Sequence, residues 1–151
     1  MKSLIATGLV LCAGIVGSLA PATSAQATQN FHGNICQPTN PSDVNRLFYA
    51  GAGTEALSAA KVSCALFTDG KNIKSIEVNV RRTDLPTTFC SISAVDWNGN
   101  TPATIAFSIP AGQQYNIATV PNYAKGVYFS YAVSCGLPTG QVLTSINVYT
   151  P

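Results

Sequence analysis

Apolar and polar residues alternate along most of the sequence from Arg46 onward, with turn-forming residues between the alternating runs. The clearest run places Ile76, Val78 and Val80 on one side and polar residues between them. A period of two is typical of a half-buried β-strand, and no stripe with the period of a helix persists over three turns. The alternation therefore predicts an all-β domain whose strands have one buried and one wet face.

The other predicted strands are short. They lie at residues 47–49, 62–66, 90–94, 105–109, 115–119, 127–135 and 142–148. About eight strands of this kind are usually buried by packing two sheets together, so we predict an antiparallel β-sandwich of the jelly-roll or Greek-key kind. A closed barrel is the second choice, because closure removes exposed sheet edges. The sandwich domain is expected over residues 46–151, preceded by an irregular segment over residues 28–45.

Residues 1–27 have the pattern of an export signal. Lys2 supplies the positive start, residues 4–19 are apolar and uncharged, and Ala25-Gln26-Ala27 is a cleavage sequence of the A-x-A kind. A membrane anchor is the rival interpretation, but the apolar stretch is short against the roughly 20 residues that cross a bilayer. The pattern therefore predicts a signal peptide.

Cys12 lies within the apolar core of this signal. A lipoprotein needs a small residue before its lipidated cysteine, and Leu11 stands there instead. We therefore expect the mature chain to begin at Thr28, to be secreted into a periplasm or the medium, and not to insert into a membrane.

The expected mature chain contains four cysteines, namely Cys36, Cys64, Cys90 and Cys135. An even number in an oxidising compartment predicts two disulfides. A zinc site is the alternative, but it needs closely spaced ligands, and the nearest two cysteines are 26 positions apart. We favour pairing Cys36 with Cys64 and Cys90 with Cys135, because each bond then joins neighbours in sequence. Three of the four share a face with core residues, which indicates a structural role.

The charge of the chain argues against some partners. Only 9% of the residues are charged, and seven basic residues face six acidic ones once the signal is removed. Nucleic acids and anionic membranes are bound by clustered Lys and Arg, whereas the adjacent Arg81 and Arg82 point to opposite faces of a strand. We therefore expect no nucleic-acid partner and a neutral polar surface.

The segment Asp96-Trp97-Asn98-Gly99-Asn100 is the most suggestive of a binding site. Its Asp and Asn residues repeat the D-x-N-x-N spacing that opens a calcium loop, but the sixth and twelfth positions hold threonine and phenylalanine instead of glycine and glutamate. Asn98-Gly99 instead favours a tight hairpin turn, because both residues tolerate a positive φ. We therefore predict a turn and expect no metal and no cofactor.

Trp97, the only tryptophan, offers an aromatic face on which a sugar ring can stack, with polar neighbours to bond its hydroxyls. A Trp97 that caps the end of the core is the alternative, and the residue type favours it. Tyrosines at 115, 123, 128 and 149 would extend the aromatic surface. The candidate ligand-binding residues are Asp96, Trp97, Asn98, Asn100 and Tyr128.

We find no catalytic constellation in the sequence. His32, the only histidine, lies just after the expected cleavage site, where chains are often mobile, and no G-x-S-x-G motif is present. Gly51-Ala52-Gly53 lacks the following Lys and Ser or Thr that hold phosphate, so it is expected to be a turn or bulge. A paired-carboxylate hydrolase is formally possible, because such pairs meet in space. Its acids would come from Asp43, Glu55, Asp69, Glu77, Asp84 and Asp96.

The residues around the cysteines are similar to those of a known group. The motifs are Gly33-Asn34-Ile35-Cys36-Gln37-Pro38, Val62-Ser63-Cys64, Phe89-Cys90-Ser91-Ile92 and Ser134-Cys135-Gly136-Leu137-Pro138. With the signal, they resemble the small secreted four-cysteine β proteins of bacteria, which are mostly uncharacterised. Ala65 departs from the proline that often follows this cysteine. The resemblance implies a disulfide-stapled sandwich, and it implies no activity.

Three functions are then considered. The leading hypothesis is an exported, non-catalytic sandwich that binds a glycan or a cell-surface ligand such as a surface protein. The alternative is a structural or interaction protein of the envelope or extracellular matrix. A carboxylate-dependent hydrolase comes third.

Overall fold

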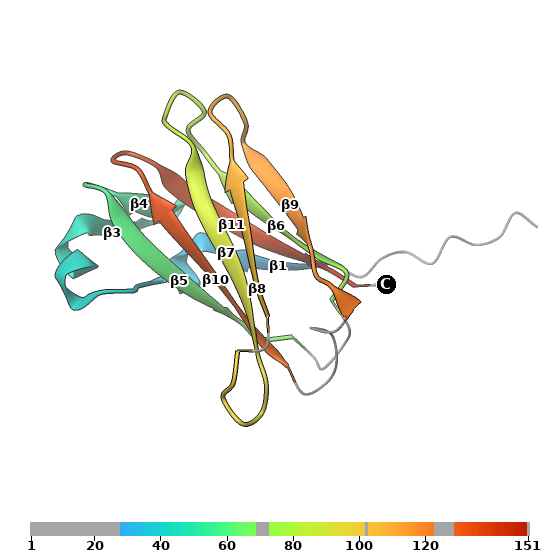
Figure 1. Ribbon diagram of the computed structural model, residues 1–151. Coiled ribbons are helices and arrows are strands. Elements are labelled where there is room, and N and C mark those ends of the chain that lie inside the picture. The colour runs from blue at the N-terminus through green and yellow to red at the C-terminus, as the bar shows by residue number, and fades with distance from the viewer. Residues whose placement is uncertain (1–27, 69–72, 102, 123–128, 151) are drawn as a thin grey trace, which may run out of the picture.

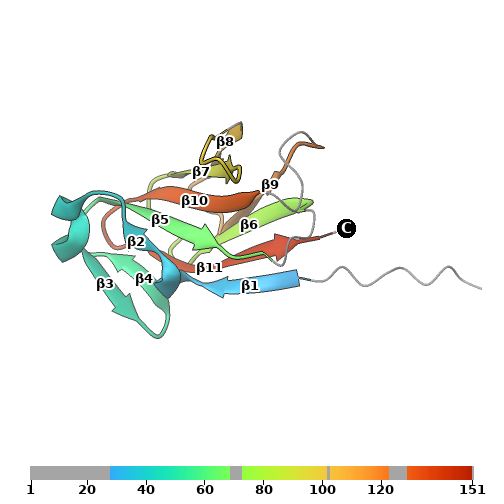
Figure 2. The same ribbon diagram turned by 90° about the horizontal axis from the view of Figure 1, so that it is seen from below.

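The computed structural model describes residues 28–68, 73–101, 103–122 and 129–150, which form two antiparallel sheets packed face to face (Figures 1 and 2). In chain order the elements are β1 (Thr28–His32), the 3-10 helix η1 (Gly33–Ile35), β2 (Gln37–Pro38), the 3-10 helix η2 (Pro41–Arg46), β3 (Leu47–Ala50), β4 (Gly53–Ala56), β5 (Ala60–Leu66), β6 (Ser75–Val80), β7 (Thr88–Val95), β8 (Ala103–Ile109), β9 (Tyr115–Thr119), β10 (Ser130–Leu137) and β11 (Val142–Tyr149). This confirms the predicted all-β antiparallel sandwich, with more strands than the eight or so expected.

Sheet A has the strand order β3-β4-β11-β6-β9, and sheet B has the order β2-β5-β10-β7-β8. The strand β1 also belongs to sheet A, where it pairs with the last five residues of β11 while β4 pairs with the first two. Because the chain forms two separate sheets, the barrel alternative is wrong. The core lies between the sheets and is built from the alternate apolar residues that predicted the strands, such as Ile76, Val78 and Val80.

We predicted that residues 28–45 form an irregular segment, and this prediction is wrong. They contain β1, β2 and most of η2, and Thr28 in β1 pairs with Tyr149 of β11. The sequence of β1 has one apolar residue, Phe31, so it shows no alternation. Backbone pairing with β11, rather than a buried face, accounts for this strand.

Both predicted disulfides are present, Cys36–Cys64 and Cys90–Cys135, and all four cysteines are buried. Cys90 and Cys135 lie directly opposite each other on β7 and β10, and Cys36 precedes β2, which pairs with β5. Both bonds therefore tie strands within sheet B, and neither joins the two sheets.

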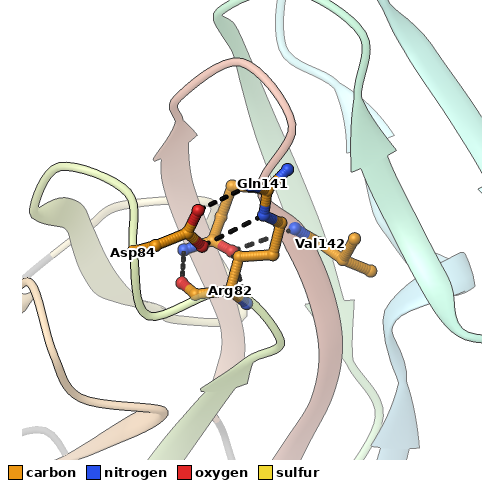
Figure 3. A network of polar contacts seen from close by, with 4 residues as sticks. All are labelled: Arg82, Asp84, Gln141 and Val142. Carbon is orange, nitrogen blue, oxygen red and sulfur yellow. Dashed lines mark hydrogen bonds and ion pairs between the residues drawn. The ribbon is translucent and has the colours of Figure 1, made fainter.

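Gln141 fixes the crossing of the chain from sheet A to sheet B (Figure 3). Its side chain is buried, and its Oε1 accepts hydrogen bonds from the backbone N–H groups of Arg82 and Val142. Its Nε2 donates to the carbonyl of Arg82, which follows β6, and to the hydroxyl of Thr88, which begins β7. Gln141 therefore holds both ends of the β6–β7 loop. Within the loop, the Arg82 guanidinium also pairs with Asp84, 2.6 Å away.

Candidate functional site

The loop that joins β7 and β8, at the bottom of Figure 1, contains a tight turn between Asp96 and Asn100. The backbone N–H of Asp96 donates to the carbonyl of Asn100 (2.9 Å), and that of Gly99 donates to the carbonyl of Asp96 (3.0 Å). Gly99 has a φ of +82°, and no residue other than glycine has a positive φ in the described part of the chain. The predicted hairpin is confirmed, and only its glycine uses the left-handed conformation.

The Asp96 carboxylate holds this loop from within. Its Oδ1 accepts the backbone N–H groups of Asn98 and Asn100, each at 2.9 Å, and its Oδ2 accepts the side-chain amide of Asn100 at 3.2 Å. Partial desolvation opposes ionisation, but the hydrogen bonds from Asn100, Asn98 and Gly99 outweigh it and lower the pKa of Asp96. The D-x-N-x-N spacing thus places backbone donors around a carboxylate.

Trp97 projects into solvent from this fixed loop, with 79% of its surface exposed. The expectation that it caps the core is therefore wrong. The reason is geometric: Ala94 is the last buried residue of β7, and Trp97 lies in the turn beyond it.

A second aromatic side chain lies at the same end of sheet B. Phe67 follows β5 directly and is 82% exposed. Leu66 of β5 pairs with Tyr131 of β10, which in turn pairs with Ala94 of β7. With strands about 4.8 Å apart, β5 and β7 are about 10 Å apart. We call Phe67 and Trp97 the aromatic end of sheet B.

The predicted tyrosine extension of this surface does not form as expected. Tyr115 and Tyr149 lie on the outer face of sheet A, because they pair with Asn79 and Ser75, the wet positions of β6. Tyr123 and the candidate ligand residue Tyr128 lie outside the described residues. Of the tyrosines considered, neither described one joins Trp97.

The outer face of sheet A carries a polar network centred on Glu77. Its carboxylate accepts from the amides of Asn79 (2.8 Å) and Asn147 (2.7 Å) and from the hydroxyl of Tyr149 (3.0 Å). Asn30 on β1 extends the network by donating to Asn147. The hydrogen bond to Glu77, and then partial burial, raise the pKa of Tyr149. The sequence predicted that Glu77 faces water but not its partners, which the register of β6 and β11 decides.

A groove of about 550 Å³ lies at the other end of sheet B, and the sequence analysis missed it. One wall comes from η2 and the start of β5, the other from Pro86 and Thr87 in the β6–β7 loop, and Gly136–Pro138 also line it. It contains the cations Arg46 and Lys61 and the buried Asp43. We call it the basic groove. The only signal in the sequence is the three-residue spacing of Asp43 and Arg46, which suits an ion pair on a helical turn.

His32 and the neighbouring Gly51-Ala52-Gly53 turn have structural positions. His32 ends β1; its Nδ1 accepts from the backbone N–H of Asn34, and its Nε2 lies 3.1 Å from the carbonyl of Gly51. The expected mobility of this residue is therefore wrong. The turn expected at Gly51-Ala52-Gly53 is confirmed, since it joins β3 to β4.

Five of the six acids considered for a hydrolase lie within the described residues, and Asp69 lies outside them. Asp43 lies in the basic groove, Glu77 on the outer face of sheet A and Asp96 in the β7–β8 loop. Asp84 pairs with Arg82, and Glu55 on β4 also attracts the Arg82 guanidinium. Among the described residues, no group of three or more His, Cys, Asp or Glu side chains is placed to hold a metal ion. No helix in the described ranges is long and apolar enough to cross a membrane.

Comparison with known proteins gives likenesses of structure. No family model and no curated protein matches the sequence. A carbohydrate-binding module of Cel9A from Ruminococcus flavefaciens FD-1 is 11% identical with a TM-score of 0.47, over 82% of this chain and 98% of the module. The exo-β-1,3-galactanase of Phanerochaete chrysosporium is 9% identical with a TM-score of 0.47, and the GH26-CBM35 β-(1,4)-mannanase of Podospora anserina is 10% identical with a TM-score of 0.43. Each match covers 82% of this chain, which spans 29% and 28% of the two enzymes, respectively.

Proposed function

We propose that this chain is an exported, non-catalytic β-sandwich protein that binds a glycan at the aromatic end of sheet B. The observation that carries the proposal is the 79% exposed indole of Trp97 on a loop that the Asp96 carboxylate fixes. An indole exposed in this way can stack on the C–H face of a sugar ring. Phe67, 82% exposed at the same end of the sheet, offers a second ring.

The rigidity of the loop supports binding. Hydrogen bonds to Asp96 already order Asn98 and Asn100 in the free protein. A ligand that stacks on Trp97 therefore does not have to order the loop, and less of the interaction energy is lost to conformational entropy. Asp96 and Asn100 serve in this proposal to present Trp97, and the side chain of Asn98 is the polar group beside it.

Export belongs to the same proposal. Two buried disulfides are stable in an oxidising compartment, and the signal pattern of residues 1–27 directs the chain there. Membership of the small secreted four-cysteine β proteins of bacteria is likewise proposed, on the motifs around the four cysteines.

The first prediction concerns Trp97. Screening the oxidised protein on a glycan array should identify a bound saccharide, and Trp97→Ala should weaken that binding about tenfold or more, because a stacked aromatic ring contributes on the order of 1 kcal/mol beyond the area it buries. Trp97 is the only tryptophan, so the intrinsic fluorescence of the protein reports on this loop directly. The saccharide should shift the emission to the blue and protect the indole from a soluble quencher.

The control is Phe48→Ala, which removes a 53% exposed ring from β3 on the other sheet and should leave binding unchanged. Undiminished binding by Trp97→Ala, or an emission spectrum that no bound saccharide changes, would contradict the proposal. If no glycan binds, the alternative of a structural or interaction protein takes its place.

A further inference from the structure

The structure also points to a second binding site. We propose that the basic groove binds the carboxylate of an acidic saccharide, a hexuronate, between the side chains of Arg46 and Lys61. That the ligand is a saccharide rests on the proposed function, whereas the position of the site between Arg46 and Lys61 does not. Pro86 and Thr87 of the groove precede β7 and Trp97 follows it, so the two sites lie at opposite ends of this strand, whose eight residues span about 25 Å.

Arg46 is held in position by the buried Asp43 carboxylate and by a backbone carbonyl. Its Nη1 donates to the Asp43 carboxylate at 3.3 Å and to the carbonyl of Ala59 at 3.4 Å. Asp43 is only 5% exposed and also accepts from the backbone N–H of Lys61 and the amide of Asn40. A guanidinium has five N–H donors, and in the described part of the structure the bonds of Arg46 involve Nη1 only. Its Nη2 and Nε therefore keep donors for a ligand.

Lys61 supplies the second cation. Its backbone N–H bonds to Asp43, whereas its side chain is exposed and forms no ion pair among the described residues. On the outer face of sheet B, Lys61 pairs with Gly136, which pairs with Phe89. The backbones of Lys61 and Phe89 are therefore about 10 Å apart, and Gly136 places no side chain between Lys61 and the 70% exposed Phe89.

The charge and shape of the groove select the ligand. Asp43, Arg46 and Lys61 together carry one net positive charge, which matches a single carboxylate. A planar carboxylate fits the fork of a guanidinium in two parallel hydrogen bonds. Pro86 and Pro138 offer apolar surface to the C–H face of a sugar ring, and Thr87 and Ser42 offer hydroxyls to its polar edge. The volume of about 550 Å³ is within the range of small-ligand sites.

The test uses trigalacturonate and, as the neutral control, the fully methyl-esterified form of the same trisaccharide. Amide chemical shifts of the ¹⁵N-labelled, oxidised protein locate the bound ligand. We expect trigalacturonate, but not its ester, to shift the amides of residues 42–46, 59–61 and 136–137. Binding should weaken as salt is added, because the carboxylate pairs with partly exposed cations.

Lys61→Gln should weaken the binding of trigalacturonate about tenfold, since a hydrogen-bonded charge pair is lost. The backbone bond to Asp43 is kept, so the fold should not change. Arg46→Lys keeps the charge but removes the fork, and it should also weaken binding. Lys74→Gln is the matched control, because Lys74 is an exposed lysine beside β6 of sheet A, and it should bind as the parent does.

The outcomes separate the two proposals. Equal binding of the acid and the ester, or no effect of Lys61→Gln, overturns the groove proposal. Tighter binding of a sulfated trisaccharide or of a diglutamate peptide overturns the ligand assignment. Shifts confined to the β7–β8 loop overturn the groove and leave the proposed function standing. Shifts in the groove that persist in Trp97→Ala, with no saccharide found at Trp97, overturn the proposed function and leave the groove.

Discussion

Two glycines occupy the point where β1 and β4 meet over β11. A Cβ atom on Gly33 would lie 2.0 Å from the carbonyl oxygen of Leu143, and one on Gly53 would lie 2.1 Å from the same atom. Thr54 closes the junction by donating its hydroxyl to the carbonyl of Gly33. No side chain fits there, because the backbone of Leu143 and Thr144 lies against both glycines, at the place where the register between β11 and β6 shifts.

Gly53→Ala should therefore lower the free energy of unfolding by at least about 3 kcal/mol, because it adds a backbone clash to a strained φ of +132°. Gly51→Ala, two residues earlier in the same turn, meets nothing within 4 Å and should change the free energy of unfolding by less than about 0.5 kcal/mol. Urea unfolding of the two variants measures the difference. Equal midpoints would show that the junction relaxes around the added methyl group.

At the scale of single residues, the sequence predicted burial better than it predicted partners. Cys90 and Cys135 were placed in the core by alternation, and their pairing was favoured because each predicted bond joins cysteines that are neighbours in sequence. The bond between Gln141 and Arg82 joins residues 59 positions apart, so only the folded chain reveals it. Trp97 was misplaced because alternation ends where the turn begins.

At the scale of elements, the two open edges on one side of the sandwich are connected by one side chain. Asn116 on β9, the edge of sheet A, donates through Nδ2 to the carbonyl of Ser108 on β8, the edge of sheet B. Its Oδ1 accepts the backbone N–H of Ile117, 2.8 Å away. The side chain thus occupies backbone groups that an added strand would otherwise use.

Asn116→Leu should increase association of the oxidised protein, because it frees the Ile117 N–H and the Ser108 carbonyl on an edge that also exposes Tyr115. Sedimentation at increasing concentration measures the effect. Asn98→Leu, an exposed substitution in the β7–β8 turn, is the comparison, and its sedimentation should match that of the parent protein at every concentration. Parent-like sedimentation of Asn116→Leu would mean that the edge is protected by other means.

The elements themselves could be predicted where one face is buried and the other is wet. The runs of β5, β6 and β7 satisfy this condition, and their predicted ranges lie within the observed strands. By contrast, β1 has a single apolar residue and β2 has two residues in all, so neither carries a periodic signal. Both form because a neighbouring strand offers backbone hydrogen bonds, which no local pattern records.

At the scale of the whole molecule, both disulfides join segments of sheet B and stabilise the folded chain. They close loops with sequence separations of 28 and 45 residues, and the chain-entropy model gives each a contribution of about 4 kcal/mol. Together this is comparable to the total stability of a typical domain, which is about 5 to 15 kcal/mol.

Reduction should therefore shift the urea midpoint strongly, and the double variants Cys36→Ala with Cys64→Ala and Cys90→Ala with Cys135→Ala should each lose about 4 kcal/mol. Equilibrium unfolding of the two variants and of the reduced parent provides the measurement. A reduced parent with an unchanged midpoint would show that the packed core holds the sheets without covalent help.

The pairing of β1 with β11 also determines how the molecule would respond to a pulling force. Thr28 lies opposite Tyr149 in an antiparallel pair, so tension applied through the outer ends of these two strands loads one residue pair at a time. The two strands would separate from that end at low force, in an unzipping geometry. The crosslinks of sheet B would bear no load until the chain had been drawn out as far as Cys36. Sheet A would thus yield first, through the separation of β1 from β11, whereas the two disulfides would keep the strands of sheet B connected.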